Sequence, residues 1–144
     1  MKIPIKKLDN KAVVPTYGST EAAGADLYAN LNEPVKIRGN ETVLVGTGIS
    51  LAIPNGYVGL IFPRSGWAVK RGLSLANCVG VIDSDYRGEI KVALHNHTGY
   101  SRTIGHGDRL AQIVFVPFMK SSFDIVDELG DTERGDGGFG STGK

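Results

Sequence analysis

The sequence predicts an all-β fold, and three observations support this prediction. Helical periodicity is nearly absent from the 144 residues. Short runs rich in β-branched residues recur along the chain, and each run is closed by a turn signal such as glycine, proline or asparagine. Strands at this spacing, with turns between them, are typical of a β-sandwich or β-barrel. The expected strands are Lys2–Lys6, Thr42–Val45, Ile49–Ile53, Tyr57–Phe62, Glu89–Leu94 and Leu110–Val116.

Two local signals refine this prediction. Asn55-Gly56 lies between two of the expected strands, and both residue types tolerate positive φ, so the pair predicts a tight hairpin. The only expected helix is one or two turns over Ser65–Arg71, opened by Ser65 as its N-cap and ended by Gly72. No internal repeat or linker indicates a second domain.

Composition excludes several classes of protein. Hydrophobic residues make up 41% and charged residues 22% of the chain, as in ordinary globular domains. No apolar run is long enough for a transmembrane helix and no secretory signal is evident, so we expect a cytoplasmic protein without a membrane partner. The single cysteine, Cys78, cannot form an internal disulfide and is expected to pack, as is Trp67. A net charge of +1 argues against a nucleic-acid partner but allows a small anionic ligand.

The C-terminal end differs from the rest of the chain. Residues 130–144 consist mainly of glycines, charges and hydroxyls, with Phe139 as the single large apolar residue. Such a segment buries too little surface to offset its ordering entropy alone. We therefore expect a single β domain over residues 1–129 and, belonging to it, a flexible glycine-rich tail over residues 130–144.

The order of residues within this tail nevertheless indicates a ligand. Its glycines expose backbone N–H groups, Ser141 and Thr142 add hydroxyl donors, and Arg134 adds a guanidinium. A loop of this kind is suited to wrapping phosphate oxygens. Phe139, isolated among glycines, is expected to stack on a flat ring such as a nucleobase.

Two further segments carry candidate sites. Phe62–Gly66 places Arg64 between a strand and the short helix, a combination that favours phosphate, although a capped turn with a solvated arginine is the alternative. Gly80–Gly88 contains Asp83 directly after an apolar stretch, where its carboxylate is suited to orienting a water nucleophile. Tyr86 in the same segment is suited to packing flat on a sugar. The alternative for this segment is an ordinary β-turn.

Four polar residues lie in or beside apolar runs, and for each the sequence leaves open a structural role and a role in binding a ligand or a metal ion. Asp26 is either a structural carboxylate or an outer-shell partner of a metal ion. Gln112 lies in a strongly apolar strand and needs partners there, from backbone or from a ligand. His95 and His97 share one face of a strand, but two histidines without a third ligand are weak support for a zinc site.

Taken together and in order, these segments resemble the five motifs of the trimeric dUTPase family. The resemblance covers most of the chain, in Ala23–Leu27, Pro63–Gly66, Asn77 with Gly80–Gly88, Gly107–Phe115, and Arg134–Gly143. It implies a jelly-roll-like, distorted β-barrel (the dUTPase-like or β-clip fold) with one short helix and a flexible C-terminal tail. It also implies a homotrimer in which each active site is shared between subunits and the tail closes over a neighbour's site.

The resemblance assigns roles to individual residues. Asp83 would position and deprotonate the attacking water, with Gln112 and Ser65 in the same catalytic set. Mg²⁺ would be held mainly by the triphosphate and by water, with Asp26 as an outer-shell partner. The implied substrate-binding residues are Arg64, Ser65, Gly66, Asn77, Gly80, Val81, Ile82, Asp83, Tyr86, Lys91, Gln112, Arg134, Phe139, Gly140, Ser141 and Thr142.

Within this set, Asn77 and the backbone of Val81 to Asp83 and of Lys91 would hold uracil, and Tyr86 would lie under the deoxyribose. The implied activity is hydrolysis of dUTP to dUMP and pyrophosphate, which limits uracil incorporation into DNA and supplies dUMP for dTMP synthesis. The alternatives are a dCTP deaminase or bifunctional deaminase–diphosphatase of the same superfamily, and a non-catalytic nucleotide-binding trimer.

Overall fold

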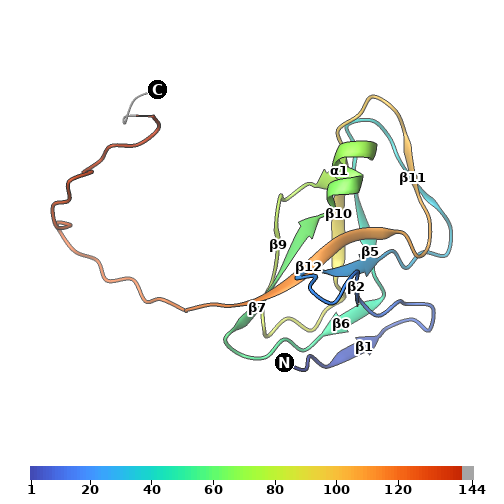
Figure 1. Cartoon of the computed structure of the whole chain (residues 1–144), viewed down its shortest axis with the longest axis horizontal. Coiled ribbons are helices and arrows are strands. Elements are labelled where there is room, and N and C mark those ends of the chain that lie inside the picture. The colour runs from blue at the N-terminus through green and yellow to red at the C-terminus, as the bar shows by residue number, and fades with distance from the viewer. Residues whose placement is uncertain (141–144) are drawn as a thin grey trace.

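The computed structural model describes residues 1–140. This part of the chain folds into twelve short strands and one helix, arranged in four sheets around a single core (Figure 1). The elements are β1 (Ile5–Lys7), β2 (Thr16–Tyr17), β3 (Ala25–Tyr28), β4 (Val35–Ile37), β5 (Thr42–Gly46), β6 (Ile49–Leu51), β7 (Tyr57–Pro63), α1 (Ser65–Arg71), β8 (Leu73–Leu75), β9 (Gly80–Ile82), β10 (Lys91–Asn96), β11 (Arg102–Ile104) and β12 (Arg109–Pro117).

The largest sheet has five strands in the order β2-β3-β12-β7-β9, and every pairing in it is antiparallel. Its long central strand, β12, pairs with β3 on one side and β7 on the other. The register places Gln112 opposite both Asp26 and Phe62. Strand β9 pairs only with β7, so it forms one edge of this sheet.

A three-stranded sheet, β5-β10-β8, lies beside the first. Buried and more exposed positions alternate along β10, so Val92, Leu94 and Asn96 face the core while Lys91 and His95 face outward. Asn96 is fully buried, and its amide donates to the carbonyls of Ile37, Arg38 and Tyr100. A buried amide with this many partners fixes the neighbouring loops.

The fold class is confirmed: the described residues are almost all β structure or loops, and their sheets have the distorted, jelly-roll-like arrangement without closing into a barrel. The six expected strands are present, with ends shifted by a few residues; the first begins at Ile5 instead of Lys2. Six strands lie outside the expected runs. These strands (β2, β3, β4, β8, β9 and β11) have only two to four residues each, too few to show an alternating pattern.

The predicted helix is confirmed at Ser65–Arg71, and Gly72 ends it in the left-handed conformation with φ 63°. The predicted N-cap is wrong by one residue. Arg64 occupies the cap position with extended backbone angles, and no side chain caps the helix. Trp67 is the buried residue of the helix, and the Arg71 guanidinium lies 4.7 Å from the centre of its ring.

The predicted hairpin at Asn55-Gly56 is also wrong. A tight turn does form there, since the Tyr57 N–H donates to the Pro54 carbonyl at 3.1 Å and Gly56 has φ 81°. However, Asn55 does not adopt positive φ, and the strands on either side belong to different sheets: β6 pairs with β1, whereas β7 pairs with β12 and β9. The turn therefore redirects the chain between sheets.

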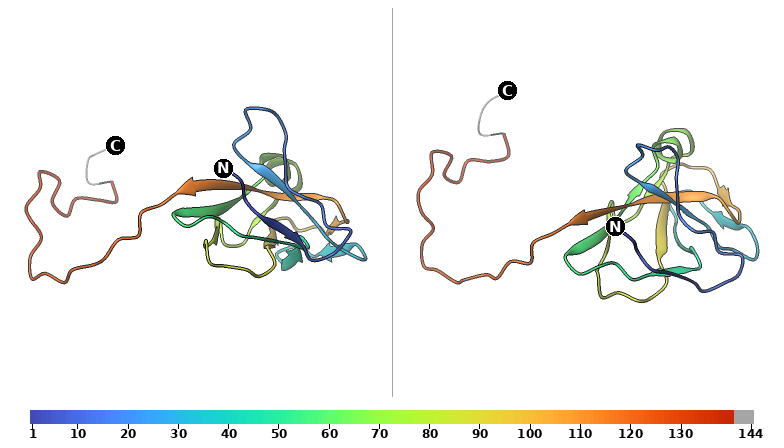
Figure 2. Two further views of the ribbon diagram at one scale, coloured as in Figure 1. Left: turned by 90° about the horizontal axis from the view of Figure 1, so that it is seen from below. Right: turned by 60° about the horizontal axis from the view of Figure 1, so that its bottom comes forward.

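After β12 the chain leaves the body of the molecule (Figures 1 and 2). The Phe118 N–H still donates to the Gly56 carbonyl at 3.0 Å, but residues 118–140, called the arm below, contain no helix or strand. The expected domain boundary at residue 129 lies within this arm. In residues 1–140 no helix is long and apolar enough to span a membrane.

Candidate active site

A groove lies between strands β9 and β10, at the junction of the two main sheets. Two adjoining hollows form it, with volumes of about 270 and 120 Å³. Leu44, Val81, Ile82, Asp83, Tyr86, Glu89 and Lys91 line the larger hollow. Leu44, Ile61, Leu75, Asn77, Gly80, Lys91, Val92 and Ala93 line the smaller one. The structure thus brings together all six residues that the sequence assigned to base and sugar.

The groove presents backbone as well as side chains. Strand β9 pairs with β7 through Gly80–Ile82, and within the described residues no strand pairs with its other edge. The unpaired N–H and C=O groups of an edge strand are available to a ligand that offers matching donors and acceptors. One edge of a pyrimidine ring offers such a pattern.

Tyr86 is held in place within the larger hollow. Its hydroxyl donates to the Glu89 carbonyl at 3.0 Å. A Cβ atom on Gly88 would overlap the hydroxyl and come within 2.5 Å of the ring carbon that carries it. Gly88 therefore allows the close packing of Tyr86, because only a residue without a side chain leaves room for the ring.

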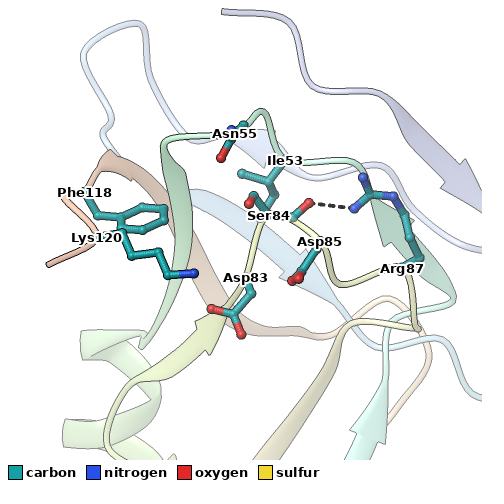
Figure 3. A pocket seen from close by; sticks show the side chains of 8 residues that line it. All are labelled: Ile53, Asn55, Asp83, Ser84, Asp85, Arg87, Phe118 and Lys120. Atoms are coloured by element: carbon teal, nitrogen blue, oxygen red, sulfur yellow. Dashed lines mark hydrogen bonds between the residues drawn. The ribbon is translucent and has the colours of Figure 1, made fainter. Parts of the chain in front are cut away.

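Asp83 lies where the groove meets a third hollow, which is outside the groove and has a volume of about 610 Å³ (Figure 3). Asp85, Arg87 and Lys120 line this third hollow, and the Lys120 side chain extends toward Asp83. The Arg87 guanidinium donates to the Ser84 carbonyl at 2.7 Å and so stabilises the loop. Ion pairs within residues 1–140 involve other carboxylates, so the Asp83 carboxylate is free to accept a proton or a hydrogen bond.

A separate cluster of charge lies on the five-stranded sheet. The Asp26 carboxylate is 2.8 Å from Arg64 Nε through one oxygen and 3.3 Å from Arg109 Nη1 through the other. Asp26 is 7% exposed, so two arginines neutralise a nearly buried carboxylate. Of the two interpretations of Asp26, the structural one fits this geometry directly, and the cluster carries one net positive charge near the start of α1.

Gln112 completes this cluster on the same face. Its amide donates to the Pro63 carbonyl at 3.1 Å, so of the partners expected for it, backbone is the one present. A Cβ atom on Gly24 would approach Gln112 Oε1 to 2.6 Å, which shows how closely the first motif packs on the amide. Ser65 and Gly66 are exposed at the first turn of α1 beside Arg64.

The structure does not join this cluster to the groove within one chain. None of Arg64, Ser65, Gly66 and Gln112 lines either hollow of the groove. The sequence-based set of site residues therefore divides into two spatial groups: base and sugar residues along β9 and β10, and cationic or hydroxyl residues around the start of α1.

The third predicted group lies on the arm, away from both. Phe139 is fully exposed with φ 50°, and the Arg134 guanidinium donates to the Gly137 carbonyl at 2.8 Å instead of meeting the body. Gly140 has φ 93°, a conformation that favours glycine. Ser141 and Thr142, expected to contact phosphate, lie outside the described residues.

Two expectations about single residues have different outcomes. Trp67 is buried, as expected of a packing residue, but Cys78 is exposed, so its predicted packing role is wrong. Cys78 lies in the tight turn between β8 and β9, where its φ is 61° and its N–H donates to the Leu75 carbonyl at 3.2 Å. His95 and His97 bond to the hydroxyls of Thr42 and Ser74.

Metal-binding clusters are absent from the described part of the chain. Residues 1–140 contain no group of three or more His, Cys, Asp or Glu side chains placed to hold an ion. Leu44 and Glu89 line the groove, although the sequence did not single them out. Leu44 is 61% exposed in the middle of β5, and nothing in the apolar run Thr42–Gly46 distinguishes it from a core residue.

Comparison with known proteins places these features in a family. Residues 10–143 match the family model described as dUTPase. The deoxyuridine 5'-triphosphate nucleotidohydrolase of Nautilia profundicola is 50% identical over the whole of both chains. A variant of the Staphylococcus bacteriophage 80alpha dUTPase, solved with dUpNHpp, is 28% identical with a TM-score of 0.90 over 99% of each chain.

A second solved relative carries a metal. A variant dUTPase from phage phi11 of S. aureus, whose structure describes the coordination of a structural Mg(II) ion, is 26% identical with a TM-score of 0.80. The similarity covers 89% of this chain and 98% of that one. The match of the family model to nearly the whole length, together with 50% identity to a full-length relative, confirms the resemblance drawn from the motifs: the chain belongs to the dUTPase family.

Proposed function

We propose that this chain hydrolyses dUTP to dUMP and pyrophosphate. One observation carries the proposal: in a member of the dUTPase family, an unpaired strand edge, a sugar-sized hollow with a fixed tyrosine and a free carboxylate follow one another along a single groove. The relatives named for this activity, or solved with dUpNHpp, match over their full length.

Uracil lies where the two hollows of the groove meet. The donors and acceptors that match one edge of the base come from Asn77 in the smaller hollow, from the backbone of Val81 to Asp83 in the larger one, and from the backbone of Lys91, which lines both. Backbone groups are fixed in direction, so they accept the uracil pattern and leave an amino group at the same position without an acceptor.

The deoxyribose lies in the larger hollow against Tyr86. The hydroxyl end of the ring is held by its bond to Glu89 and by the close approach of Gly88. A rigid ring beneath the sugar excludes a 2′-hydroxyl by steric contact. An apolar wall alone gives discrimination of only about a hundredfold, which makes the rigidity of Tyr86 part of its role.

Asp83 acts as the general base. Its carboxylate accepts a proton from a water molecule as the water oxygen bonds to the α-phosphorus and the bond to the bridging oxygen of pyrophosphate breaks. Such reactions require positioning and charge stabilisation rather than a covalent intermediate. No nucleophilic side chain is needed in the groove.

The triphosphate extends from the groove to the cationic cluster of a neighbouring subunit. Arg64, Ser65, Gly66 and Gln112 do not line the groove of their own chain, which supports a homotrimer with shared sites. Large apolar side chains of the arm point into solvent, including Phe123 and Ile125, and such exposed surface is typical of an interface.

The arm closes the site. Phe139 stacks on uracil, while Arg134, Gly140, Ser141 and Thr142 contact the β- and γ-phosphates. Glycine-rich backbone with an arginine is suited to these anions, and a closing segment of this kind sequesters the reaction from water. The fully exposed Phe139 ring has no partner in the body, which supports a role with a ligand.

Mg²⁺ is the proposed cofactor. The described residues offer no cage of three ligands, which fits an ion bound chiefly by substrate phosphates and water. Asp26 is the proposed outer-shell carboxylate. Because both of its oxygens are held by arginines, it would reach the ion through water. When bound, the ion neutralises charge on the triphosphate.

We expect the protein to act in the cytoplasm. There its activity would limit uracil incorporation into DNA and supply dUMP. The test offers purified protein dUTP, dCTP, dTTP and UTP with Mg²⁺ and identifies the products. We expect dUMP and pyrophosphate from dUTP only. Ammonia from dCTP would indicate a deaminase instead, and binding of dUpNHpp without any turnover of dUTP would indicate a non-catalytic nucleotide-binding protein.

A further inference from the structure

His95 and His97 form a pair of side chains that the proposed function does not use. His95 lies on the outward face of β10, and His97 follows directly after the strand. Neither residue lines the groove or the third hollow. Their ring centres are only 4.5 Å apart, and the two rings are inclined at 70°. Two imidazoles this close can offer ring nitrogens to one ligand.

Each imidazole is held by a hydroxyl group on a neighbouring strand. Thr42 Oγ1 on β5 lies 2.9 Å from His95 Nδ1, and Ser74 Oγ on β8 lies 2.6 Å from His97 Nε2. Among residues 1–140 no hydrogen bond uses the other ring nitrogens, His95 Nε2 and His97 Nδ1. Histidines that bind a metal ion have this arrangement, with one nitrogen on the ion and the other donating to a fixed partner.

The backbone that carries the pair is fixed. The His97 N–H donates to the Gly72 carbonyl at 2.8 Å, and the Asn96 N–H donates to the Glu41 carbonyl at 3.0 Å. Between the two histidines, Asn96 is fully buried and bonds through its side chain to β4 and to the loop that follows β10. A site on such a backbone loses little conformational freedom when an ion binds.

The separation of the rings matches that of two ligands on one ion. An imidazole nitrogen binds a transition metal at about 2.0–2.1 Å, which places the ring centre about 3.2 Å from the ion. Two ring centres are then about 4.5 Å apart when the ligands form a right angle, and about 5.2 Å apart at the tetrahedral angle. The observed 4.5 Å corresponds to the right angle, which is typical of square-planar or tetragonal Cu²⁺ and Ni²⁺.

We propose that His95 and His97 form a binding site for a tetragonal transition metal ion, Cu²⁺ or Ni²⁺, with water in the remaining positions. Two protein ligands are fewer than the three or four of ordinary zinc sites, so the bound ion is exchangeable. The site is separate from that of the proposed Mg²⁺, which is a hard ion that prefers oxygen. This inference goes beyond the proposed function and does not rest on it.

The test measures metal binding in the absence of nucleotide, on full-length protein without an affinity tag. All proteins carry Cys78→Ser, because the exposed Cys78 thiol would itself bind copper. In this parent, His97→Gln removes one ligand and keeps a side chain that can bond to Ser74. His106→Gln is the matched control, because His106 lies outside the pair and accepts the Leu31 N–H through Nδ1. Calorimetric titration gives the dissociation constants for Ni²⁺ and Cu²⁺.

Outer-shell partners of a metal ligand change metal affinity by about 10–100-fold. We expect Ser74→Ala, which leaves both imidazoles in place, to weaken Ni²⁺ binding about tenfold, and His97→Gln to weaken it by more than about a hundredfold. Ni²⁺ should raise the melting temperature of the parent, because an ion that binds only the folded state stabilises it, and should not raise that of His97→Gln. The electron paramagnetic resonance spectrum of Cu²⁺ on the parent should show a tetragonal ion with nitrogen ligands. His106→Gln should resemble the parent in every measurement.

Three results would overturn the inference. The first is a parent protein that binds neither Ni²⁺ nor Cu²⁺. The second is an unchanged affinity in a folded His97→Gln protein. The third is an equal loss in His97→Gln and His106→Gln, which would mean that single histidines bind the ions independently. All three differ from failure of the proposed function, in which the unaltered protein releases no pyrophosphate from dUTP.

Discussion

The body of the molecule and its arm are built in opposite ways. In the body, β12 is paired on both sides and side chains such as Ile113 and Leu27 are fully buried. In the arm, Phe123, Ile125 and Phe139 are almost completely exposed, and no strand or helix forms in residues 118–140. The body holds the base and sugar site ready, whereas the arm can contribute only after it is ordered.

Because of this difference, the body and the arm contribute to ligand binding in different ways. Fixed backbone on β9 loses little freedom when a base binds, so recognition there is preorganised. Each residue of the arm loses conformational entropy of roughly 1–2 kcal/mol on ordering, which contacts with phosphate and with a neighbouring subunit must offset. The arm should therefore respond to the whole triphosphate, and the body to uracil and deoxyribose.

The largest effect should come from the body residue at the reacting centre. Asp83→Asn removes the proton acceptor but keeps the shape of the side chain. General-base catalysis contributes about 10²–10⁴-fold, so we expect kcat to fall by that factor while dUpNHpp still binds. Steady-state release of pyrophosphate and titration with dUpNHpp measure the two quantities. Near-normal turnover would remove Asp83 from its assigned role.

Removal of the tail tests the arm in the same way. A chain ending at residue 133 loses Arg134, Phe139 and the glycine-rich backbone. We expect kcat/KM for dUTP to fall about a hundredfold, because the phosphates are no longer positioned. The melting temperature should be unchanged, since residues 134–140 contribute nothing to the buried core. A collapsed body would contradict the division between the two regions, as would full activity.

The same division explains what the sequence could predict. Long β-branched runs predicted β7 and β12, because seven or nine residues are enough to show a strand. Strand β9 has three residues, too few to show a strand pattern, so the residues of Gly80–Gly88 indicated a candidate site but not a strand. The Asn55-Gly56 turn was correctly placed but assigned to the wrong pairing, because sheet membership depends on partners far along the chain.

The candidate site shows the same limits. Motifs identified Asp83, Tyr86 and Gln112, but no local pattern indicates that Glu89 anchors on Gly48 or that Leu44 reaches both hollows. The Glu89–Gly48 contact joins residues 41 positions apart, and the hollows that Leu44 lines are built from several separate strands. Roles that require a second subunit, such as those of Arg64 and the arm, depend on an assembly that one chain does not contain.

A third prediction tests the charge cluster of the body. Asp26→Asn removes the carboxylate that Arg64 and Arg109 share, leaving two guanidinium groups facing each other. Because Asp26 is nearly buried while Arg109 is half exposed, we expect a loss of about 2 kcal/mol in the free energy of unfolding. Urea denaturation measures it, and an unchanged midpoint would mean that the cluster contributes nothing to stability.

A fourth, smaller effect should arise at the sugar. Gly88→Ala places a Cβ atom against the Tyr86 hydroxyl and must displace the ring. We expect KM for dUTP to rise about tenfold and discrimination against UTP to weaken, because a tilted ring no longer blocks a 2′-hydroxyl. Gly18→Ala is the matched control, since a Cβ atom there meets nothing within 4 Å. If Gly88→Ala retains both KM and selectivity, Tyr86 does not set the sugar preference.

The smallest effect should be confined to acid conditions and to the body. The backbone N–H of Lys11 and the side-chain amide of Asn30 both donate to the Asp9 carboxylate. These bonds, with that from Lys11 having the larger effect, lower the pKa of the carboxyl from the usual 3.8. A lowered pKa in the folded protein means that the stabilisation is complete above the unfolded value and is lost as pH falls through the folded value.

We expect Asp9→Asn to lower the melting temperature slightly at pH 7, and the difference from the unaltered protein to shrink below about pH 4. A difference that stays constant across this range would show that Asp9 acts through packing and not through its charge. Because the groups that lower the pKa of Asp9 all lie in the body, the chain ending at residue 133 should show the same pH dependence as the full chain.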